Sequence, residues 1–151
     1  MLQGWLDWHR QTLLTKCAGL TPEQLRTASA QPSNLTLLGL VRHMTTVERA
    51  WFTIRAAGHH DAPRLYISDD NIDGDFDDIA DADPAADFAA FRAELVASDK
   101  AVAELPLDHE FTHRDRRFSL RWVYLHMIEE YARHNGHADL IRERIDGATG
   151  D

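Results

Sequence analysis

Apolar residues recur along the chain at the three- and four-residue spacing of amphipathic helices, in four separate stretches. These stretches cover residues 2–18, 37–58, 84–104 and 119–147. Thr36 and Asp83 are suitable N-caps for the second and third stretches, and Gly147 is a suitable terminator for the fourth. A capping box at 21–24 predicts a further short helix, and no stretch has the alternating pattern of a convincing strand.

Four amphipathic helices in 151 residues predict an all-α fold, a four-helix bundle that forms one domain over residues 1–151. We expect the four apolar stripes to converge on one core in an antiparallel bundle. Two connections, 59–82 and 106–118, are longer than bundle connections usually are. The first is therefore expected to be a long crossover connection or a lid over a site.

Composition and charge narrow the class of protein. No apolar run approaches membrane-spanning length, and the N-terminus lacks a basic region followed by an apolar one, so we expect a cytoplasmic protein without a membrane partner. The net charge of −9 argues against nucleic acid as a partner. The single cysteine, Cys17, falls on an apolar stripe and is interpreted as a buried hydrophobe rather than a nucleophile. Trp8 lies off that stripe, which suggests a homodimer.

The acidic segment 69–83 partly matches a calcium-binding loop. Positions one, three, five and six of the EF-hand pattern are filled by Asp69, Asn71, Asp73 and Gly74. Position twelve, which requires a bidentate glutamate, is Ala80, and no helix leads directly into the loop. A solvated acidic loop is therefore the favoured interpretation of this segment.

Ionisable residues on apolar helix faces are the strongest chemical feature of the chain. Glu130 lies about 40° from His134 on the fourth helix, and an i, i+4 pair can converge on one point. His43 occupies a similar position on the second helix. A lone histidine on such a face is more often a structural core residue, but a buried glutamate requires a strong partner. The combination favours a divalent-metal site inside the bundle.

Residues 37–52 and 119–139 resemble the second and fourth helices of the DinB-like (YfiT-like) superfamily of metal-dependent enzymes. The nearest branch is the one related to mycothiol-dependent maleylpyruvate isomerase. The resemblance implies a four-helix bundle with a long crossover connection, in agreement with the pattern. The isomerase carries an additional C-terminal domain, whereas this chain ends shortly after its fourth helix, so we do not expect the isomerase reaction.

The resemblance also implies roles for particular residues. Many members of the superfamily use one histidine on the second helix and an i, i+4 pair on the last, which places the ligands at His43, Glu130 and His134. His137 is expected in the second shell or the pocket lining, and His9 is a weaker candidate for that lining. His126 is expected to be structural, and Arg42 and Arg133 are expected to be solvated.

Two imidazoles and a carboxylate leave open positions on a divalent metal and suit zinc, with nickel or manganese as alternatives. Relatives use low-molecular-weight thiols such as mycothiol, so the resemblance implies an S-transferase that joins a small-molecule thiol to an electrophile. Two alternatives stay open: a metallohydrolase that uses metal-bound water, and a non-catalytic metal-binding or stress-related protein.

Overall fold

The computed structural model describes residues 1–150 of the chain and is mostly helical. Its helices are α1 (Leu2–Cys17), α2 (Pro22–Leu25), α3 (Leu37–Glu48), the π-helix η1 (Arg49–Ala56), α4 (Gly74–Asp77), α5 (Pro84–Val102) and α6 (Leu120–Asp146). Two short strands, β1 (Glu110–His113) and β2 (Arg116–Ser119), form an antiparallel pair. The four predicted helical stretches are therefore present, and the third ends two residues earlier than expected.

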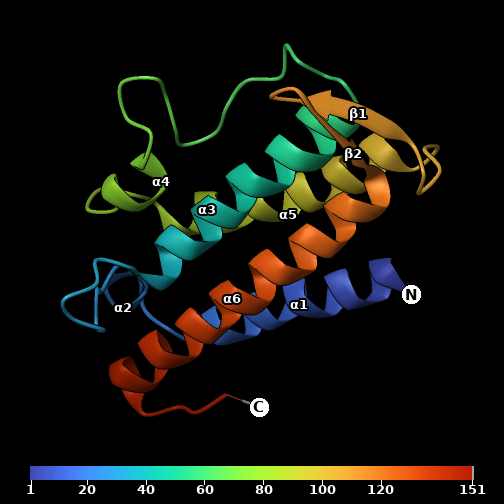
Figure 1. The fold of residues 1–151 in the computed structure, drawn as a ribbon. Coiled ribbons are helices and arrows are strands. Elements are labelled where there is room, and N and C mark those ends of the chain that lie inside the picture. Colours follow the sequence, from blue (N-terminus) through green and yellow to red (C-terminus); the bar gives the residue numbers. More distant parts are fainter. Residues whose placement is uncertain (151) are drawn as a thin grey trace.

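The long helices are arranged as two packed pairs, α1 against α6 and α3 with η1 against α5. Figure 1 shows that the members of each pair run in the same direction, so the expectation of a wholly antiparallel bundle is wrong. Two parallel neighbours require a connection that returns along their length. The segment between η1 and α5, which contains α4, makes this return across the outside of the helices (Figure 1).

Helix boundaries follow the capping residues that the sequence provides. The hydroxyl groups of Thr36 and Ser119 accept hydrogen bonds from backbone amides in the first turns of α3 and α6. Thr21 and Gln24 form the reciprocal capping box of α2. Gly147 ends α6 in the left-handed region, with φ of 78°, where glycine has no side-chain penalty.

The apolar stripes bury a common core between the two pairs. Fully buried members come from every long helix and include Leu6, Leu13, Leu40, Met44, Phe91 and Met127. Cys17 is buried as predicted, and burial raises the pKa of its thiol to about 12, so the thiol is protonated and unreactive at neutral pH. Trp8 is 55% exposed, in agreement with its place off the stripe, while the homodimer stays a prediction.

A buried ion pair crosses this core. Arg10 of α1 donates two hydrogen bonds of 2.7 Å to the carboxylate of Glu48, which is completely buried on α3. Tyr131 of α6 donates to the same carboxylate at 2.8 Å, and Arg10 also donates to Asp99 of α5 at 2.9 Å. Burial and the Glu48 charge raise the pKa of Tyr131, which keeps its phenol protonated as a donor. All four long helices thus meet at one polar network.

The strand pair corrects the prediction that the chain contains no strand. Its register places Phe111 opposite Phe118, and the Phe118 ring lies 5.9 Å from Trp51 of η1. The turn consists of Arg114 and Asp115 rather than the Asn-Gly pair that usually indicates a hairpin. Each strand is four residues long and mixes charged with aromatic positions, so the alternation is too short to be recognised.

The second helical stretch changes its pitch after Glu48, which the periodicity did not predict. Residues 49–56 form a π-helix, with hydrogen bonds five residues apart. Such segments are rare and frequently lie at functional sites. No helix of residues 1–150 is long and apolar enough to span a membrane.

The Arg10–Glu48 pair leads to a prediction about stability. Arg10→Met should lower the free energy of unfolding by about 3–5 kcal/mol, because it leaves the Glu48 carboxylate buried without its counter-charge. The double variant Arg10→Met/Glu48→Gln should recover part of that loss. Urea unfolding measures both, with Arg117→Met, which removes an exposed pair with Glu110, as a control expected to change stability by less than about 1 kcal/mol. Equal losses for Arg10→Met and Arg117→Met would contradict the assignment.

Candidate metal centre

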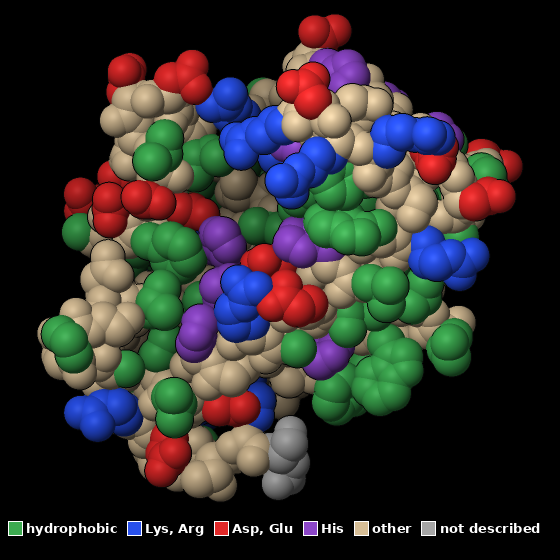
Figure 2. Space-filling model, viewed as in Figure 1, with side chains coloured by type: hydrophobic (Ala, Val, Ile, Leu, Met, Phe, Trp, Pro, Cys, Tyr) green, Lys and Arg blue, Asp and Glu red, His purple; other side chains and the backbone are tan. Residues whose placement is uncertain are grey.

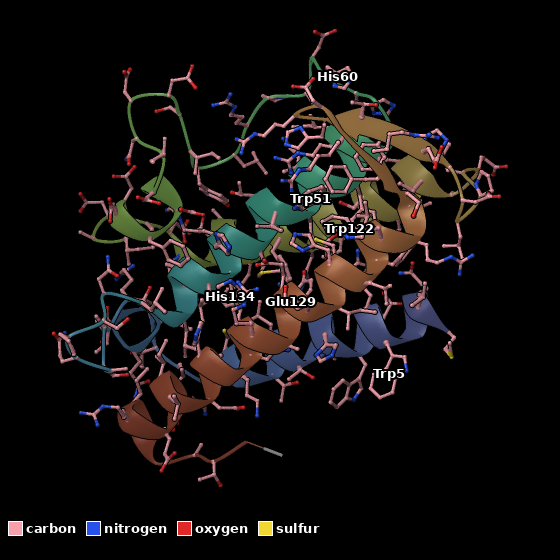
Figure 3. The ribbon with its side chains drawn as sticks, viewed as in Figure 1. Trp5, Trp51, His60, Trp122, Glu129 and His134 are labelled. Atoms are coloured by element: carbon pink, nitrogen blue, oxygen red, sulfur yellow. The ribbon has the colours of Figure 1, made fainter. Side chains whose placement is uncertain are left out.

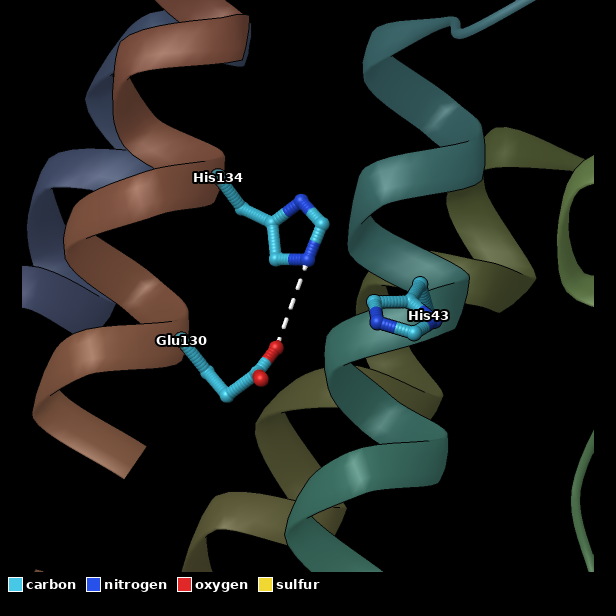
Figure 4. A group of neighbouring side chains, drawn as sticks. All are labelled: His43, Glu130 and His134. Carbon is cyan, nitrogen blue, oxygen red and sulfur yellow. Dashed lines mark ion pairs between the residues drawn. The ribbon is translucent and has the colours of Figure 1, made fainter. Parts of the chain in front are cut away.

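The structure brings His43, Glu130 and His134 together across the interface between α3 and α6 (Figure 4). One potential ligand atom from each lies within 4.8 Å of the other two. The rings of His43 and His134 are 4.8 Å apart, and Nε2 of His134 lies 3.5 Å from Oε2 of Glu130. Glu130 is 87 positions and His134 is 91 positions from His43 in sequence, and the three meet because α3 and α6 pack against each other.

His43 is oriented by a carboxylate from the acidic segment. Its Nδ1 lies 2.8 Å from Oδ2 of Asp75, which is 4% exposed. Since a carboxylate accepts, Nδ1 carries the proton and the lone pair resides on Nε2, the nitrogen left free for a metal. Phe76 stacks on the other side of the ring at 4.9 Å and limits its rotation.

His134 is oriented in the same way by another histidine. Its Nδ1 lies 3.3 Å from Nδ1 of His137, so one of these nitrogens must donate and the other accept. A metal on Nε2 of His134 requires His134 to be the donor, which fixes His137 as the Nε2-protonated tautomer. Burial, followed by the charges of His43 and His137, lowers the pKa of His134 to about 4. His134 is therefore neutral at pH 7, as ligation requires.

The two carboxylate oxygens of Glu130 face different partners. Oε2 is directed to His134, whereas Oε1 lies 3.6 Å from Nη1 of Arg133 and 4.0 Å from Nε2 of His126. Arg133 is half exposed and also pairs with Glu129, so it is solvated in part, as expected, but also contacts a candidate ligand. These contacts leave Oε2 as the oxygen that is free to bind a metal.

The donor set fits a divalent metal. Ligands of a tetrahedral zinc ion lie about 3.4 Å apart when their bonds are 2.0–2.1 Å long, close to the 3.5 Å between His134 and Glu130. Two neutral imidazoles and one carboxylate are the protein ligands of many catalytic zinc sites, which keep a further position open. Both histidines also have a hydrogen-bonded Nδ1, the outer arrangement that metal-ligating histidines almost always show.

A pocket of about 270 Å³ opens on the His43 side of the centre. Its lining includes His43, Asp75 and Phe76 together with Trp51 and Arg55 of η1. Figure 3 shows Trp51 beside Trp122 of α6, and their rings lie 5.2 Å apart. A larger hollow of about 430 Å³ lies between α1 and the C-terminal segment, but none of the three candidate ligands lines it, so its size is no guide to the chemistry.

Two other histidines named from the sequence have different positions. His9 lies between Trp5, Trp8 and Asn135 at the contact of α1 with α6, and it lines neither the metal centre nor the adjoining pocket. His126 stacks on Trp122 at 4.8 Å and faces Glu130, so it lies between an aromatic residue and a candidate metal ligand. His126, Glu129 and Glu130 form a second possible metal group, but Glu129 is 54% exposed and paired with Arg133.

The structure corrects two interpretations of polar residues. The acidic segment is not wholly solvated, because Asp75 is buried and holds His43. Arg42 is not solvated either: it is 7% exposed, donates to the Gly74 carbonyl at 3.0 Å and pairs with Asp87. The Asp75–His43 and Arg42–Gly74 hydrogen bonds fasten α4 to α3, and the Arg42–Asp87 pair joins α3 to α5. Neither the Asp75 nor the Arg42 contacts could be predicted from residues 69–83, because the eight aspartates of this segment follow no periodic pattern.

The helical fold and the His, Glu and His donors define a candidate divalent-metal protein. The chain belongs to the mycothiol-S-transferase family, whose family model matches residues 1–147. This family is DinB-like, which confirms the resemblance drawn from residues 37–52 and 119–139. No curated protein and no solved structure matched the chain.

The hydrogen bond between Asp75 and His43 leads to a prediction about the zinc affinity of the candidate centre. Asp75→Asn should weaken zinc binding about 10- to 100-fold, because the anion that fixes the His43 tautomer is lost while the side-chain volume is kept. Competition with a chromogenic chelator measures the dissociation constant. Asp77→Asn is the matched control, since Asp77 is an exposed aspartate of the same short helix. Equal affinities in the two variants would exclude the orienting role of Asp75.

Proposed function

We propose that this protein is a metal-dependent S-transferase that joins mycothiol to an electrophile, with His43, Glu130 and His134 as ligands of a zinc ion. The convergence of these three side chains beside an open pocket is the observation that carries the proposal. Membership in the mycothiol-S-transferase family supports the identity of the thiol. The proposal includes a four-helix bundle of the DinB type, which the pairing of α1 with α6 and of α3 with α5 supports.

A divalent metal at this position supplies a Lewis acid that lowers the pKa of a thiol bound to it, so that the thiolate forms at neutral pH. The chain holds the donors for that metal in place. Asp75 keeps a proton of His43 on Nδ1, and His137 accepts a hydrogen bond from Nδ1 of His134. In both imidazoles Nε2 is then the nitrogen directed to the metal, and the lowered pKa of His134 keeps that imidazole neutral at pH 7.

Aromatic residues line the open side of the candidate centre. Phe76 and Trp51 line the pocket beside His43, and their aromatic surface lowers the local dielectric constant and strengthens electrostatic interactions there. No protein nucleophile is needed in this chemistry, in keeping with the buried, protonated thiol of Cys17.

The proposal predicts that catalysis depends on the ligands. His43→Ala should lose bound zinc and reduce mycothiol consumption to the uncatalysed rate, and Glu130→Gln should lower zinc affinity because the anionic ligand is lost. The assay follows loss of free thiol with a panel of alkyl halides and epoxides. His9→Ala is the matched control, a histidine outside the centre that should leave zinc content and rate unchanged.

Equal rates for the wild-type protein and His43→Ala would remove the transferase proposal. Zinc-dependent turnover of esters or amides without any consumption of thiol would support the metallohydrolase instead. Failure of the wild-type protein to bind zinc, nickel or manganese would leave a helical protein without a metal centre.

A further inference from the structure

A second pocket continues from the one beside the metal centre. It has a volume of about 420 Å³ and lies between η1, the segment that follows η1, and the turn of the β1–β2 hairpin. The two pockets share four lining residues, Thr46, Ala50, Arg55 and Ile67. One end of this combined space therefore reaches His43, and the other end reaches Arg114.

Basic side chains line the second pocket. Four are arginines and two are histidines: Arg49, Arg55, Arg64, Arg114, His60 and His113. Figure 2 shows Lys and Arg side chains gathered on the upper part of this face, above a group of histidines. The chain as a whole carries a net charge of −9, so this pocket has the opposite sign to the protein around it.

The four arginines differ in how they are neutralised. Arg49 pairs with Glu94 at 2.5 Å and Arg64 pairs with Asp69 at 2.6 Å. Within residues 1–150, neither Arg55 nor Arg114 forms an ion pair with a carboxylate. The guanidinium of Arg55 instead stacks over the Trp51 ring at 4.3 Å, which fixes its plane at the junction of the two pockets.

The unneutralised cations repel one another. Burial and then the Arg114 charge lower the pKa of Arg55. Burial and then the charges of Arg55 and Arg114 lower the pKa of His113. The positive charges of η1 and of the hairpin therefore lie close enough to affect each other, and both line the second pocket. An anion placed between them would relieve the repulsion.

The backbone supports the same conclusion. Arg114 and Asp115 both have positive φ, at 49° and 61°, in the two-residue hairpin turn. Gly, Asn and Asp are favoured at such positions, whereas an arginine is strained there. An arginine is therefore a poor choice for the stability of the turn. It does, however, direct a guanidinium to the pocket lining.

We infer that Arg55 and Arg114 bind the carboxylate, phosphate or sulfonate group of the electrophile and so position it relative to the metal centre. The inference rests on the proposed function for the identity of the reactants. The anion-binding property itself depends on the pocket alone. The substrate class that follows is an acidic electrophile. Its reactive group would lie near His43 and its anionic group near the hairpin.

Binding of an unreactive probe tests the pocket without requiring catalysis. Calorimetric titration with 4-methylbenzoate should give saturable binding that weakens as ionic strength rises, whereas neutral 4-methylbenzamide should bind weakly or not at all. Arg55→Gln and Arg114→Gln should each weaken benzoate binding about 10- to 100-fold, the range expected for a lost charge-assisted hydrogen bond. Arg116→Gln, on the same hairpin but outside the pocket, should have no effect.

A carboxylate can also bind a metal directly, so the titration is repeated with His43→Ala, which keeps both arginines. Retained binding in that variant supports the pocket. Loss of binding in His43→Ala, with normal binding in Arg55→Gln, would show that the probe binds the metal and would overturn the inference. Thermal unfolding of each variant shows whether it is folded. Because Arg114 is exposed, Arg114→Gln should fold normally, and it keeps the test valid if Arg55→Gln does not fold.

Transfer kinetics test whether the pocket recognises an anionic group of the electrophile. Mycothiol reacts with 4-(bromomethyl)benzoate or its amide by forming a sulfur–carbon bond as bromide leaves with the bonding electron pair and the thiol proton passes to solvent. A loss of kcat/KM in Arg55→Gln for the acid alone assigns the anion to the electrophile. An equal loss for the acid and the amide would contradict recognition of the electrophile's anion and would overturn the inference.

The results separate the two proposals. Benzoate binding without any transfer would refute the proposed function and leave the anion pocket standing. Transfer that proceeds equally in the wild-type protein, Arg55→Gln and Arg114→Gln, with no benzoate binding, would refute the anion pocket and leave the transferase standing.

Discussion

The placement of the candidate centre depends on the hydrogen bonds and ion pairs of one buried group, the guanidinium of Arg10. It binds Glu48 of α3 and Asp99 of α5, and Glu48 accepts a further hydrogen bond from Tyr131 of α6. A buried charge must keep its partner, because desolvation without compensation costs several kcal/mol. The network therefore opposes any sliding of α3 along α6. Since the candidate ligands lie on these two helices, their convergence depends on a register that the network holds.

The helices and the irregular segments contribute different parts of the site. Helices α3 and α6 provide the metal donors, whose spacing requires a rigid framework. The return segment provides Asp75, and the hairpin provides Arg114, so the electrostatic environment comes from chain that lies outside the helical core. The π-helix η1 joins these parts, because Trp51 and Arg55 line the pocket that opens beside His43.

The sequence predicted the helices and the three converging side chains because both produce a pattern with the period of a helix. His43 and His134 stand out as ionisable groups on apolar stripes. Asp75 could not be recognised, since nothing distinguishes it from the other aspartates of its segment until the chain folds. Arg10 was missed because its partner is 38 residues away. The hairpin was missed because its strands are short and mix charged with aromatic residues, so they show no clear alternation. The π-helix η1 was missed because its wider turns depart from the α-helical period.

The hydrogen bond from His43 to Asp75 also couples two events that occur on different parts of the chain. Asp75 belongs to the segment between η1 and α5, and its carboxylate contacts a ring whose other nitrogen is free for the metal. Coupling of this kind is reciprocal: the free energy by which an ordered Asp75 strengthens metal binding equals the free energy by which the metal strengthens the ordering of Asp75. In the proposed metal site, metal binding would therefore strengthen the ordering of the outer segment beside the pocket, and a substrate that contacts this segment would bind the loaded protein more tightly than the empty one.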